Sequence, residues 1–593
     1  MNLEIILTLT IIAVAVILFA TEKLRVDIIA LLVLLTLVLS GLIEADQAFM
    51  GFASPAVITV WAVYIVSGAL FKTGITDILG AWIARLAGNS EPRLIAIIML
   101  TCGTMSAFMN NIGATAMLLP AVVGVSRKSG VRLSKLLIPL AFSSLLGGNM
   151  TQIGTPPNIL ATSILTDRGL PSFGFFDFTP TGIIVFLTGV IYMVFVGRFL
   201  LPSHTNVEDA QKDKLREYVT EVRVLEESRL IGLSLSEAHL DDELGLSVLA
   251  MVHEGEQVVR IDSETVIRAD DLLIVSGDVK SLIEADTKIG VVIEPDFKFQ
   301  LSDLDSDAAH VFEAVLPSRS QFAGRTVKEV RFRDRYGFTV LAIWRQGEVL
   351  VDRLRDVKLR TADVLLLKGA RKNMSDLQQN NQVLVLEPLE LNRQRTKKAP
   401  LALGILGLVL LLTTFAGFHI STAMVIGSVL MVLTGCLSMD EAYQSIEWRS
   451  VFLIAGMLPL GTVMESTGTA QFLADQIVNL AGVWGPLAVL AGIYILAGLI
   501  TEPMSNAAAT VLMVPIAIDI ALELGANPQS FVLAVVIGAS TSFLTPVGHQ
   551  SNVLVFGPGG YRFADFTRVG WLLNVVLVIV ALLVIPFFWP LIP

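Results

Sequence analysis

Apolar segments of bilayer-spanning length fall into two groups, which a long polar stretch separates. A transmembrane helix needs about 17–25 predominantly apolar residues. Segments that meet this requirement lie near 3–20, 26–43, 54–71 and 181–200, and again near 400–416, 420–438, 451–467 and 569–590. The pattern predicts a polytopic α-helical membrane protein whose two halves flank a polar insert.

Two longer apolar regions, 94–170 and 484–558, are interrupted by Gly, Pro and Asn. Proline removes a backbone donor and clashes with the preceding helical turn. The runs Gly154-Thr-Pro-Pro-Asn158 and Pro546-Val-Gly-His-Gln-Ser-Asn552 are therefore predicted to break helices. Backbone outside a helix is tolerated at membrane depth only where it is buried in protein or lines a cavity. We expect the functional site at these interruptions.

The polar interruption of the first half recurs in the second half. Asn110-Asn-Ile-Gly-Ala-Thr-Ala-Met-Leu-Leu-Pro120 aligns with Ser505-Asn-Ala-Ala-Ala-Thr-Val-Leu-Met-Val-Pro515 at an offset of 395 residues. Asn158 aligns with Asn552 at an offset of 394 residues. Internal repeats with broken helices that meet at a central site are typical of secondary transporters. The sequence thus predicts two membrane repeats.

The distribution of Lys and Arg indicates orientation, because short cytoplasmic loops carry an excess of both. Lys23 and Arg25 place the loop after the first span inside. Basic residues on both sides of the first motif region predict a re-entrant hairpin that opens to the cytoplasm; they are Arg85, Arg93, Arg127, Lys128, Arg132 and Lys135. The flanks of its counterpart, 481–487 and 522–530, contain neither residue, which predicts a hairpin that opens outward. Five crossings per half then invert the second repeat and leave both termini outside.

Charge is concentrated in the insert. The 593-residue chain is 54% hydrophobic, yet 63 of its 95 charged residues lie between 201 and 400. The basic run 392–398 leads back to the membrane and predicts that residues 203–398 are cytoplasmic. We expect a first transmembrane repeat at 1–202, modules at 203–300 and 301–398, and a second, inverted transmembrane repeat at 399–593. The net charge of −11 gathers in no single patch, so no nucleic-acid partner is expected.

The insert is itself duplicated. The run Ser247–Glu256 aligns with Thr339–Glu348 at an offset of 92 residues, and the run that starts at Ala269 aligns with the one that starts at Ala362 at an offset of 93. Short runs of β-branched residues that end at charged, Gly-containing turns indicate strands. The insert is therefore predicted to be a tandem pair of small α+β modules.

The sequence holds no recognisable catalytic set. It contains no nucleophile with its base, no Gly-rich phosphate loop followed by Lys, and no Cys/His cluster. Cys102 and Cys436 both lie in apolar segments, as small buried residues do. We predict that the protein is not an enzyme.

A broken helix offers two kinds of ligand. The carbonyls at one half-helix end suit Na⁺, and the N–H groups at the other end suit an anion. The amide side chains of Asn111 and Asn506 add donors and acceptors without the cost of a buried charge. Two hairpin tips and two helix breaks are expected to enclose one small anionic substrate and two cations.

These motifs resemble the signature of the divalent anion/sodium symporters, the solute carrier family 13 type within the ion transporter superfamily. The resemblance rests on Asn-Asn-x-x-Ala-Thr-x-x-x-x-Pro, Gly-Thr-Pro-Pro-Asn and Thr501-Glu-Pro-Met-Ser-Asn506. The insert resembles tandem TrkA-C (RCK-C) modules. The combination is similar to bacterial and algal permeases of the sulfate type.

The resemblance implies a set of site residues. The substrate is expected at Asn110, Asn111, Thr155, Asn158, Ser505, Asn506, His549 and Asn552. The coupling ion Na⁺ is expected at Ser106, Asn111, Gly154, Thr501, Asn506 and Gly548. Ile112 and Ala507 stand where the family pattern has threonine. This loss of hydroxyl donors favours a sulfate-like oxyanion over a dicarboxylate.

Two residues keep two interpretations each. His549 either donates to the oxyanion and makes transport pH-dependent, or is a neutral imidazole bonded to the neighbouring backbone. Glu502 lies one helical turn before Asn506. It either makes a structural bond inside the hairpin or acts as a coupling carboxylate, the role that an intramembrane acid suggests.

The resulting prediction is a homodimeric, multi-pass transporter of the cell (inner) membrane. It is expected to carry out Na⁺-coupled symport of a sulfate-like anion by an elevator mechanism. The cytoplasmic modules are expected either to bind a small regulator such as a nucleotide or to serve as a rigid dimerisation platform. Alternatives are a proton- or Na⁺-coupled transporter or exporter of dicarboxylate or another anion, a ligand-gated channel, and a transporter-derived sensor.

Overall fold

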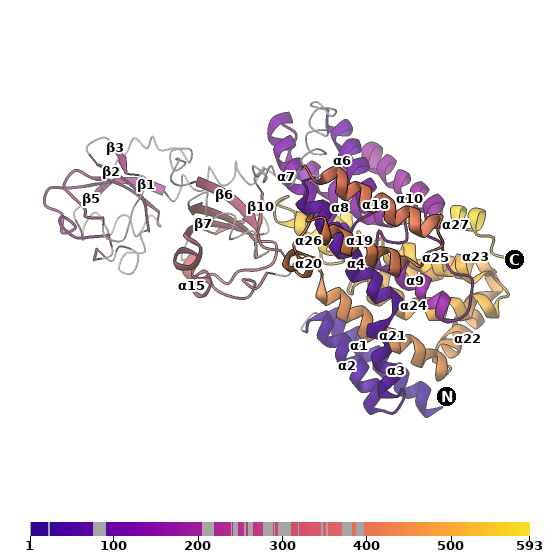
Figure 1. Cartoon of the computed structure of the whole chain (residues 1–593). Helices are drawn as coiled ribbons and strands as arrows, with labels where there is room; N and C mark the ends of the chain where they lie inside the picture. The colour runs from indigo at the N-terminus through magenta and orange to yellow at the C-terminus, as the bar shows by residue number, and fades with distance from the viewer. Residues whose placement is uncertain are drawn as a thin grey trace.

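The computed structural model (Figure 1) shows a helical body with two small β-sheets that extend from one side of it. Residues 2–592 are described apart from 22–23, 75–89, 204–218, 236, 239, 241–246, 254–255, 259–264, 277–288, 290, 294–309, 318–319, 346–347, 351–353, 370–381 and 387–396. Lys23, Arg85 and most of the run 392–398, which contribute to the predicted orientation, lie outside the described residues.

The helices of the first half match the predicted spans closely and divide the long apolar region into four pieces. They are α1 (Leu3–Thr21), α2 (Val26–Leu39), α3 (Ala45–Phe49), α4 (Pro55–Lys72), α6 (Glu91–Ser106), α7 (Asn111–Ser129), α8 (Leu137–Gly148), α9 (Pro156–Asp167), α10 (Thr179–Tyr192) and α11 (Arg198–Leu200). The predicted site residues of this half fall at or near the ends of α6 to α9, whereas Pro120 of the repeated motif lies inside α7.

The second half repeats this order. Its helices are α18 (Ala399–Thr414), α19 (Ile420–Leu433), α20 (Met439–Ser445), α21 (Trp448–Ser466), α22 (Thr469–Ala481), α23 (Pro486–Thr501), α24 (Asn506–Glu523), α25 (Pro528–Ala539), α26 (Gln550–Phe556) and α27 (Phe563–Phe588). Here the predicted site residues fall at or near the ends of α23 to α26, and Pro515 lies inside α24 as Pro120 lies inside α7.

Several helix ends follow from the residues that stand there. Proline occupies the first position of α4, α9 and α23, where its missing N–H would have no helical partner in any case. Ser54 accepts a hydrogen bond from the Ala56 N–H at 3.3 Å and caps α4. Gly130 ends α7 with a φ of 71°, a left-handed conformation that glycine adopts without strain.

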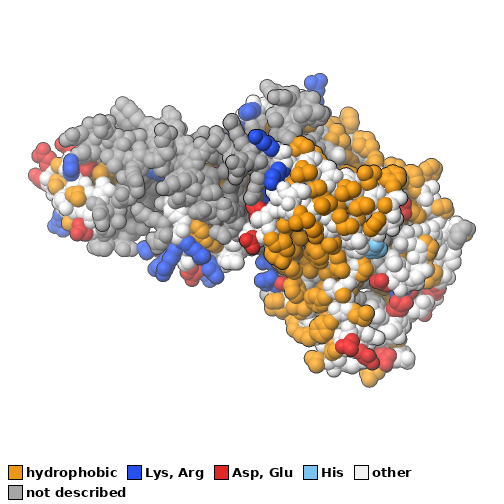
Figure 2. Space-filling model, in the orientation of Figure 1, with side chains coloured by type: hydrophobic (Ala, Val, Ile, Leu, Met, Phe, Trp, Pro, Cys, Tyr) orange, Lys and Arg blue, Asp and Glu red, His pale blue; other side chains and the backbone are white. Residues whose placement is uncertain are grey.

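The described residues contain five helical segments that are long and apolar enough to cross a membrane, or six if α20 and α21 form one bent span. The five are Leu3–Thr21, Ala45–Lys72, Thr179–Leu200, Asn506–Glu523 and Phe563–Phe588. Figure 2 shows hydrophobic side chains over most of the visible face of the helical body. The prediction of a multi-pass membrane protein is confirmed.

The two halves interlock. Helices of the first half pack against helices of the second: α2 against α21, α4 against α19, α9 against α24, and α10 against α27. Every residue of α8 is buried, and α8 packs against both α7 and α26. The helix that precedes the first break therefore lies in the middle of the bundle.

The insert contains two antiparallel sheets. Their strand orders are the same when the first sheet is read from its opposite edge, so that β1 to β5 correspond to β6 to β10. The first, in the order β3-β2-β4-β1-β5, contains β1 (Val219–Val224), β2 (Ser247–His253), β3 (Glu256–Val258), β4 (Leu272–Ser276) and β5 (Val291–Ile293). The second, in the order β10-β6-β9-β7-β8, contains β6 (His310–Val315), β7 (Phe338–Arg345), β8 (Glu348–Leu350), β9 (Val364–Gly369) and β10 (Leu384–Val385). Figure 1 places the second sheet beside the helical body and the first sheet beyond it.

The turn before the fourth strand of each module shows which residues of the two modules correspond. Asp271 accepts from the Arg268 N–H at 2.7 Å, and Asp363 accepts from the Arg360 N–H at 2.7 Å. The residue before each aspartate has a positive φ, 62° at Asp270 and 69° at Ala362. The offset is therefore 92 here too, and the predicted pairing of Ala269 with Ala362 is wrong by one residue.

Candidate functional site

Four interruptions of helix carry the motif residues. The first tip (107–110) joins α6 to α7, and the second tip (502–505) joins α23 to α24. The first break (149–155) separates α8 from α9, and the second break (540–549) separates α25 from α26.

A hydroxyl holds the first tip to the helix before the first break. Ser106 Oγ lies 2.7 Å from both the Asn111 amide and the Ser144 carbonyl. With its nitrogen turned toward Ser106, the Asn111 amide also donates to the Gly154 carbonyl at 3.1 Å. Asn110 Oδ1 accepts from the Ile112 N–H at 2.9 Å and caps α7. The predicted residues of the first tip and first break thus form one connected cluster.

The second tip repeats these contacts. Thr501 Oγ1 lies 2.8 Å from both the Asn506 amide and the Ala539 carbonyl. Ser505 Oγ accepts from the Ala508 N–H at 3.3 Å and caps α24. The bonded pairs of the two tips are related by the 395-residue offset, so the duplication in sequence is also a duplication of geometry.

Each break is stabilised by the asparagine that follows it. The amide nitrogen of Asn158 donates to the carbonyls of Gly148 at 3.2 Å and Thr151 at 2.6 Å. The amide nitrogen of Asn552 donates to the carbonyl of Ser542 at 2.9 Å and that of Thr545 at 3.2 Å. These nitrogens are occupied by backbone, so each asparagine has only its buried, unbonded Oδ1 left for a ligand.

Thr155 and His549 occupy the same place in the two halves. Their backbone angles nearly coincide, with φ and ψ of −145° and 145° for Thr155 and of −150° and 145° for His549. His549 Nδ1 accepts from the Ser551 N–H at 3.1 Å and caps α26. That bond requires an unprotonated Nδ1, so the ring proton sits on Nε2. The predicted backbone contact is present, and Nε2–H remains available as a donor.

Glu502 distinguishes the second half from the first, which has Ala107 at the equivalent position. Its Oε1 accepts from the Leu544 N–H at 2.8 Å, which joins the second tip to the second break. Its Oε2 is buried without a hydrogen-bond partner among the described residues. The carboxylate borders a cavity of about 380 Å³, whose lining residues are Ala20, Thr21, Glu502, Pro503, Thr545 and Val547.

Further polar atoms of the second half are buried and unbonded. They belong to Ser540, Ser542, Ser551 and the amide nitrogen of Asn506. Buried polar groups normally have a partner, so these atoms are candidates to receive an ion or substrate. Sequence reasoning missed the first three, although the polar run Ser540-Thr-Ser542 in an apolar region was the available signal.

Polar clusters at broken helices that are buried in a helical bundle are typical of secondary transporters. A model of the citrate transporter family CitMHS matches residues 16–538, and the chain belongs to this family. It is therefore a secondary anion transporter and not an enzyme.

Related chains agree with this assignment. An uncharacterized transporter of Synechocystis sp. is 35% identical over 96% of this chain and 95% of its own length. The uncharacterized transporter YfbS of Escherichia coli is 31% identical over 100% of both chains. Sodium/sulfate cotransporter 1 of Chlamydomonas reinhardtii is 28% identical over 62% of this chain and 43% of its own length. The crystal structure of the GsuK RCK domain covers 27% of this chain and 63% of that chain at 12% identity; its TM-score of 0.14 is too low to support an argument.

Proposed function

We propose that the protein couples inward movement of Na⁺ to uptake of a small divalent oxyanion, sulfate in preference to a dicarboxylate. The observation that carries this proposal is the doubled cluster of tip and break, built from neutral amides, hydroxyls and open backbone. The name of the algal sodium/sulfate cotransporter supports the choice of ions.

The charge of the cluster explains why anion and cation would move together. None of the described residues of the tips and breaks is Lys or Arg, so no protein cation balances the substrate. An anion that enters alone loses its hydration without an ionic partner, which is costly in a buried site. Two Na⁺ ions in the same cavity would neutralise a divalent anion, and each species raises the affinity for the other.

The residues divide between the two ligands by their chemistry. The helix starts at Asn110, Asn111, Ser505 and Asn506 offer N–H groups and amides to the anion, together with Thr155, Asn158, His549 and Asn552 around the breaks. Oxygen atoms at Ser106, Asn111, Gly154, Thr501, Asn506 and Gly548 suit Na⁺, a hard cation. Glu502 adds the only carboxylate among the four interruptions and is proposed as a coupling carboxylate of the second cation site.

The proposal extends to the architecture. Two inverted repeats with re-entrant hairpins at α6–α7 and α23–α24 would move the site across the membrane as an elevator within a homodimer, with both termini outside. The boundaries proposed are 1–202, 203–300, 301–398 and 399–593. The two middle modules would be cytoplasmic regulators, with a nucleotide as one candidate ligand.

The direct test is uptake of radiolabelled sulfate into proteoliposomes under an imposed Na⁺ gradient, with K⁺ and pH gradients as controls. We expect accumulation with inward Na⁺ alone, and its loss in Asn506→Ala or Asn111→Ala. Asn527→Ala is a matched control, because Asn527 Oδ1 also caps a helix by accepting from the Gln529 N–H, but at the start of α25. Full uptake in Asn506→Ala would overturn the site assignment.

The same assay separates the alternatives. Accumulation driven by the pH gradient would favour proton coupling, and competition by succinate would favour a dicarboxylate. Flux that depends on neither gradient and does not saturate would favour a channel. Sulfate binding without transport would favour a sensor.

A further inference from the structure

The second module touches the helical body at the loop that follows α26. A Cβ atom added to Gly557 would collide with the Ala362 carbonyl and lie 3.4 Å from Val364 Cγ2. A Cβ added to Gly560 would lie 3.8 Å from the Trp344 ring. Trp344 and Val364 belong to the same hydrophobic core as the membrane helices, as do Val315 and Leu386. The module is thus packed onto the body, with glycine at the closest approach.

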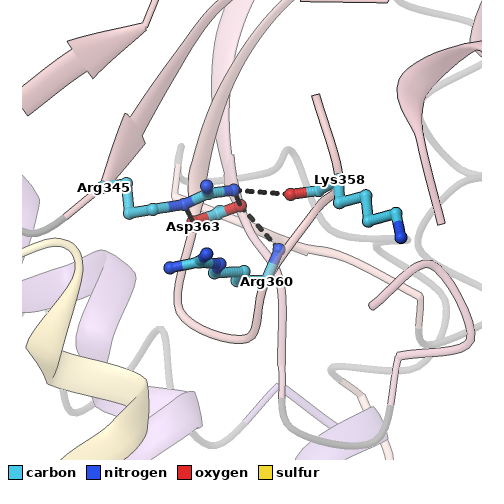
Figure 3. Close-up of polar contacts among 4 residues, drawn as sticks. All are labelled: Arg345, Lys358, Arg360 and Asp363. Carbon is cyan, nitrogen blue, oxygen red and sulfur yellow. Dashed lines mark hydrogen bonds and ion pairs between the residues drawn. The ribbon is translucent and has the colours of Figure 1, made fainter. Parts of the chain in front are cut away.

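The part of the module that makes this contact is held rigidly. Figure 3 shows Arg345 beside Asp363, with the Lys358 carbonyl and the Arg360 N–H bonded to the same pair. Arg345 Nε and an Nη donate to the Asp363 carboxylate at 2.8 and 2.7 Å, and the same Nη donates to the Lys358 carbonyl at 2.7 Å. The hydrogen bonds that the Arg345 guanidinium donates to Asp363 raise the pKa of that guanidinium. These bonds fix the left-handed turn at Ala362, whose carbonyl meets Gly557.

The loop on the membrane side is equally well fixed. Tyr561 OH donates to the Ser134 carbonyl at 2.7 Å and accepts from the Ile138 N–H at 3.1 Å, at the start of α8. One end of α26 thus leads into this loop. The other end begins directly after His549, the last residue of the second break, and carries Asn552, whose amide nitrogen donates to the Thr545 carbonyl of the break. The helix has seven residues, or about 10 Å at 1.5 Å per residue.

We propose that the second module controls the second break mechanically through α26, with Gly557 as the point of contact. This inference rests on the proposed role of the break in transport. A displacement of the Ala362 turn would move the loop, and a two-turn helix would carry that movement to His549 and Asn552. The first module lies farther out (Figure 1), and its equivalent turn at Asp270 is exposed. In this proposal the second module alone regulates transport, and it does so through the second break alone.

The test uses hydrogen exchange of the full chain in lipid nanodiscs. Gly557 has α-helical angles, with φ −64° and ψ −57°, so alanine suits its backbone and disturbs only the contact with Ala362. Gly492→Ala is the matched control, because its Cβ would meet nothing within 4 Å. We expect Gly557→Ala to raise exchange at least threefold both in 359–364 and in 550–556, and Gly492→Ala to change neither. A rise confined to 359–364 would overturn the proposal.

A second pair of variants changes the modules and leaves the membrane loop unaltered. Asp363→Asn and Asp271→Asn weaken the same turn in the two modules. Only Asp363→Asn should raise exchange in 550–556 and alter the sulfate uptake rate at least twofold. An equal effect of both variants, or none of either on 550–556, would contradict the proposed route. Because exchange needs no substrate, a wrong substrate assignment would leave this result intact, and the two proposals can fail separately.

Discussion

Arg168, which follows α9, forms an ion pair with Asp519 of α24. The two side chains are only 9% and 13% exposed, and the pair joins the two halves of the chain beside the packing of α9 on α24. Glu465 at the end of α21 lies 3.3 Å from the same guanidinium but is 56% exposed. One arginine therefore links three helices that are distant in sequence.

Removal of one partner of this pair should be strongly destabilising. Arg168→Met leaves the Asp519 carboxylate buried and unpaired, which costs about 3–5 kcal/mol, and we expect a lower thermal unfolding temperature of the purified protein. Arg168→Met combined with Asp519→Leu should recover most of the loss. Glu465→Gln is the control, since an exposed partner contributes about 0–1 kcal/mol. A double variant as unstable as the single one would show that the pair has another role.

Removal of the Thr501 hydroxyl should affect Na⁺-dependent uptake more than removal of the hydroxyl of other threonines in the membrane helices. Thr501→Val removes the hydroxyl that contacts both the Asn506 amide and the Ala539 carbonyl, at about 1–3 kcal/mol for a buried group left unsatisfied. We expect the Na⁺ concentration for half-maximal uptake to rise at least tenfold, and Thr501→Ser to restore it. Thr413→Val should be neutral, because the Thr413 hydroxyl bonds only to carbonyls of its own helix.

His549 can be tested as a cap and as a donor separately. His549→Ala removes the cap of α26, at about 1 kcal/mol, whereas His549→Asn keeps a capping acceptor but lacks Nε2–H. We expect His549→Asn to retain the unfolding temperature and to raise the KM for sulfate about tenfold. His419→Ala, which removes the similar imidazole cap of α19, should leave KM unchanged. Normal KM in His549→Asn would assign the residue a capping role alone.

Gly548 tests the packing of the second break. A Cβ at this position would lie 2.8 Å from Glu502 Oε2 and 3.1 Å from Ser542 Cβ. Gly548→Ala should therefore displace the carboxylate and lower uptake at least tenfold, while Gly404→Ala, with open space around its Cβ, should not. Uptake in Gly548→Ala equal to that of the parent would show that the break tolerates this displacement.

Much of the membrane part could be predicted from the sequence. Apolar length set the spans, and the clustering of Pro, Gly and Asn located both breaks. Single prolines such as Pro120 and Pro515 lie inside helices, so the cluster and not the lone proline was the signal. The repeated Asn111 and Asn506 identified the tips. The ion pair of Arg168 with Asp519 could not be predicted, since it joins positions 351 residues apart without a local pattern.

Other contacts were hidden for different reasons. Ser540 and Ser542 resemble ordinary small packing residues in an apolar region, and only their unbonded hydroxyls mark them. The contact between Gly557 and Ala362 depends on how the second module packs on the loop after α26. In the sequence, Gly557 cannot be told from any other glycine in a turn. The one-residue error in the pairing of Ala269 with Ala362 became clear only from the turn hydrogen bonds.

The two repeats differ by one residue between tip and break. Ser144 corresponds to Ala539 at an offset of 395, whereas Gly148 corresponds to Ser542 at an offset of 394. A single deletion after the duplication would produce this difference. α25 ends at Ala539, before the position that corresponds to the end of α8, so the second break (540–549) is longer than the first (149–155). The second break therefore has more backbone groups outside a helix than the first, so the two copies need not offer the same set of ligands.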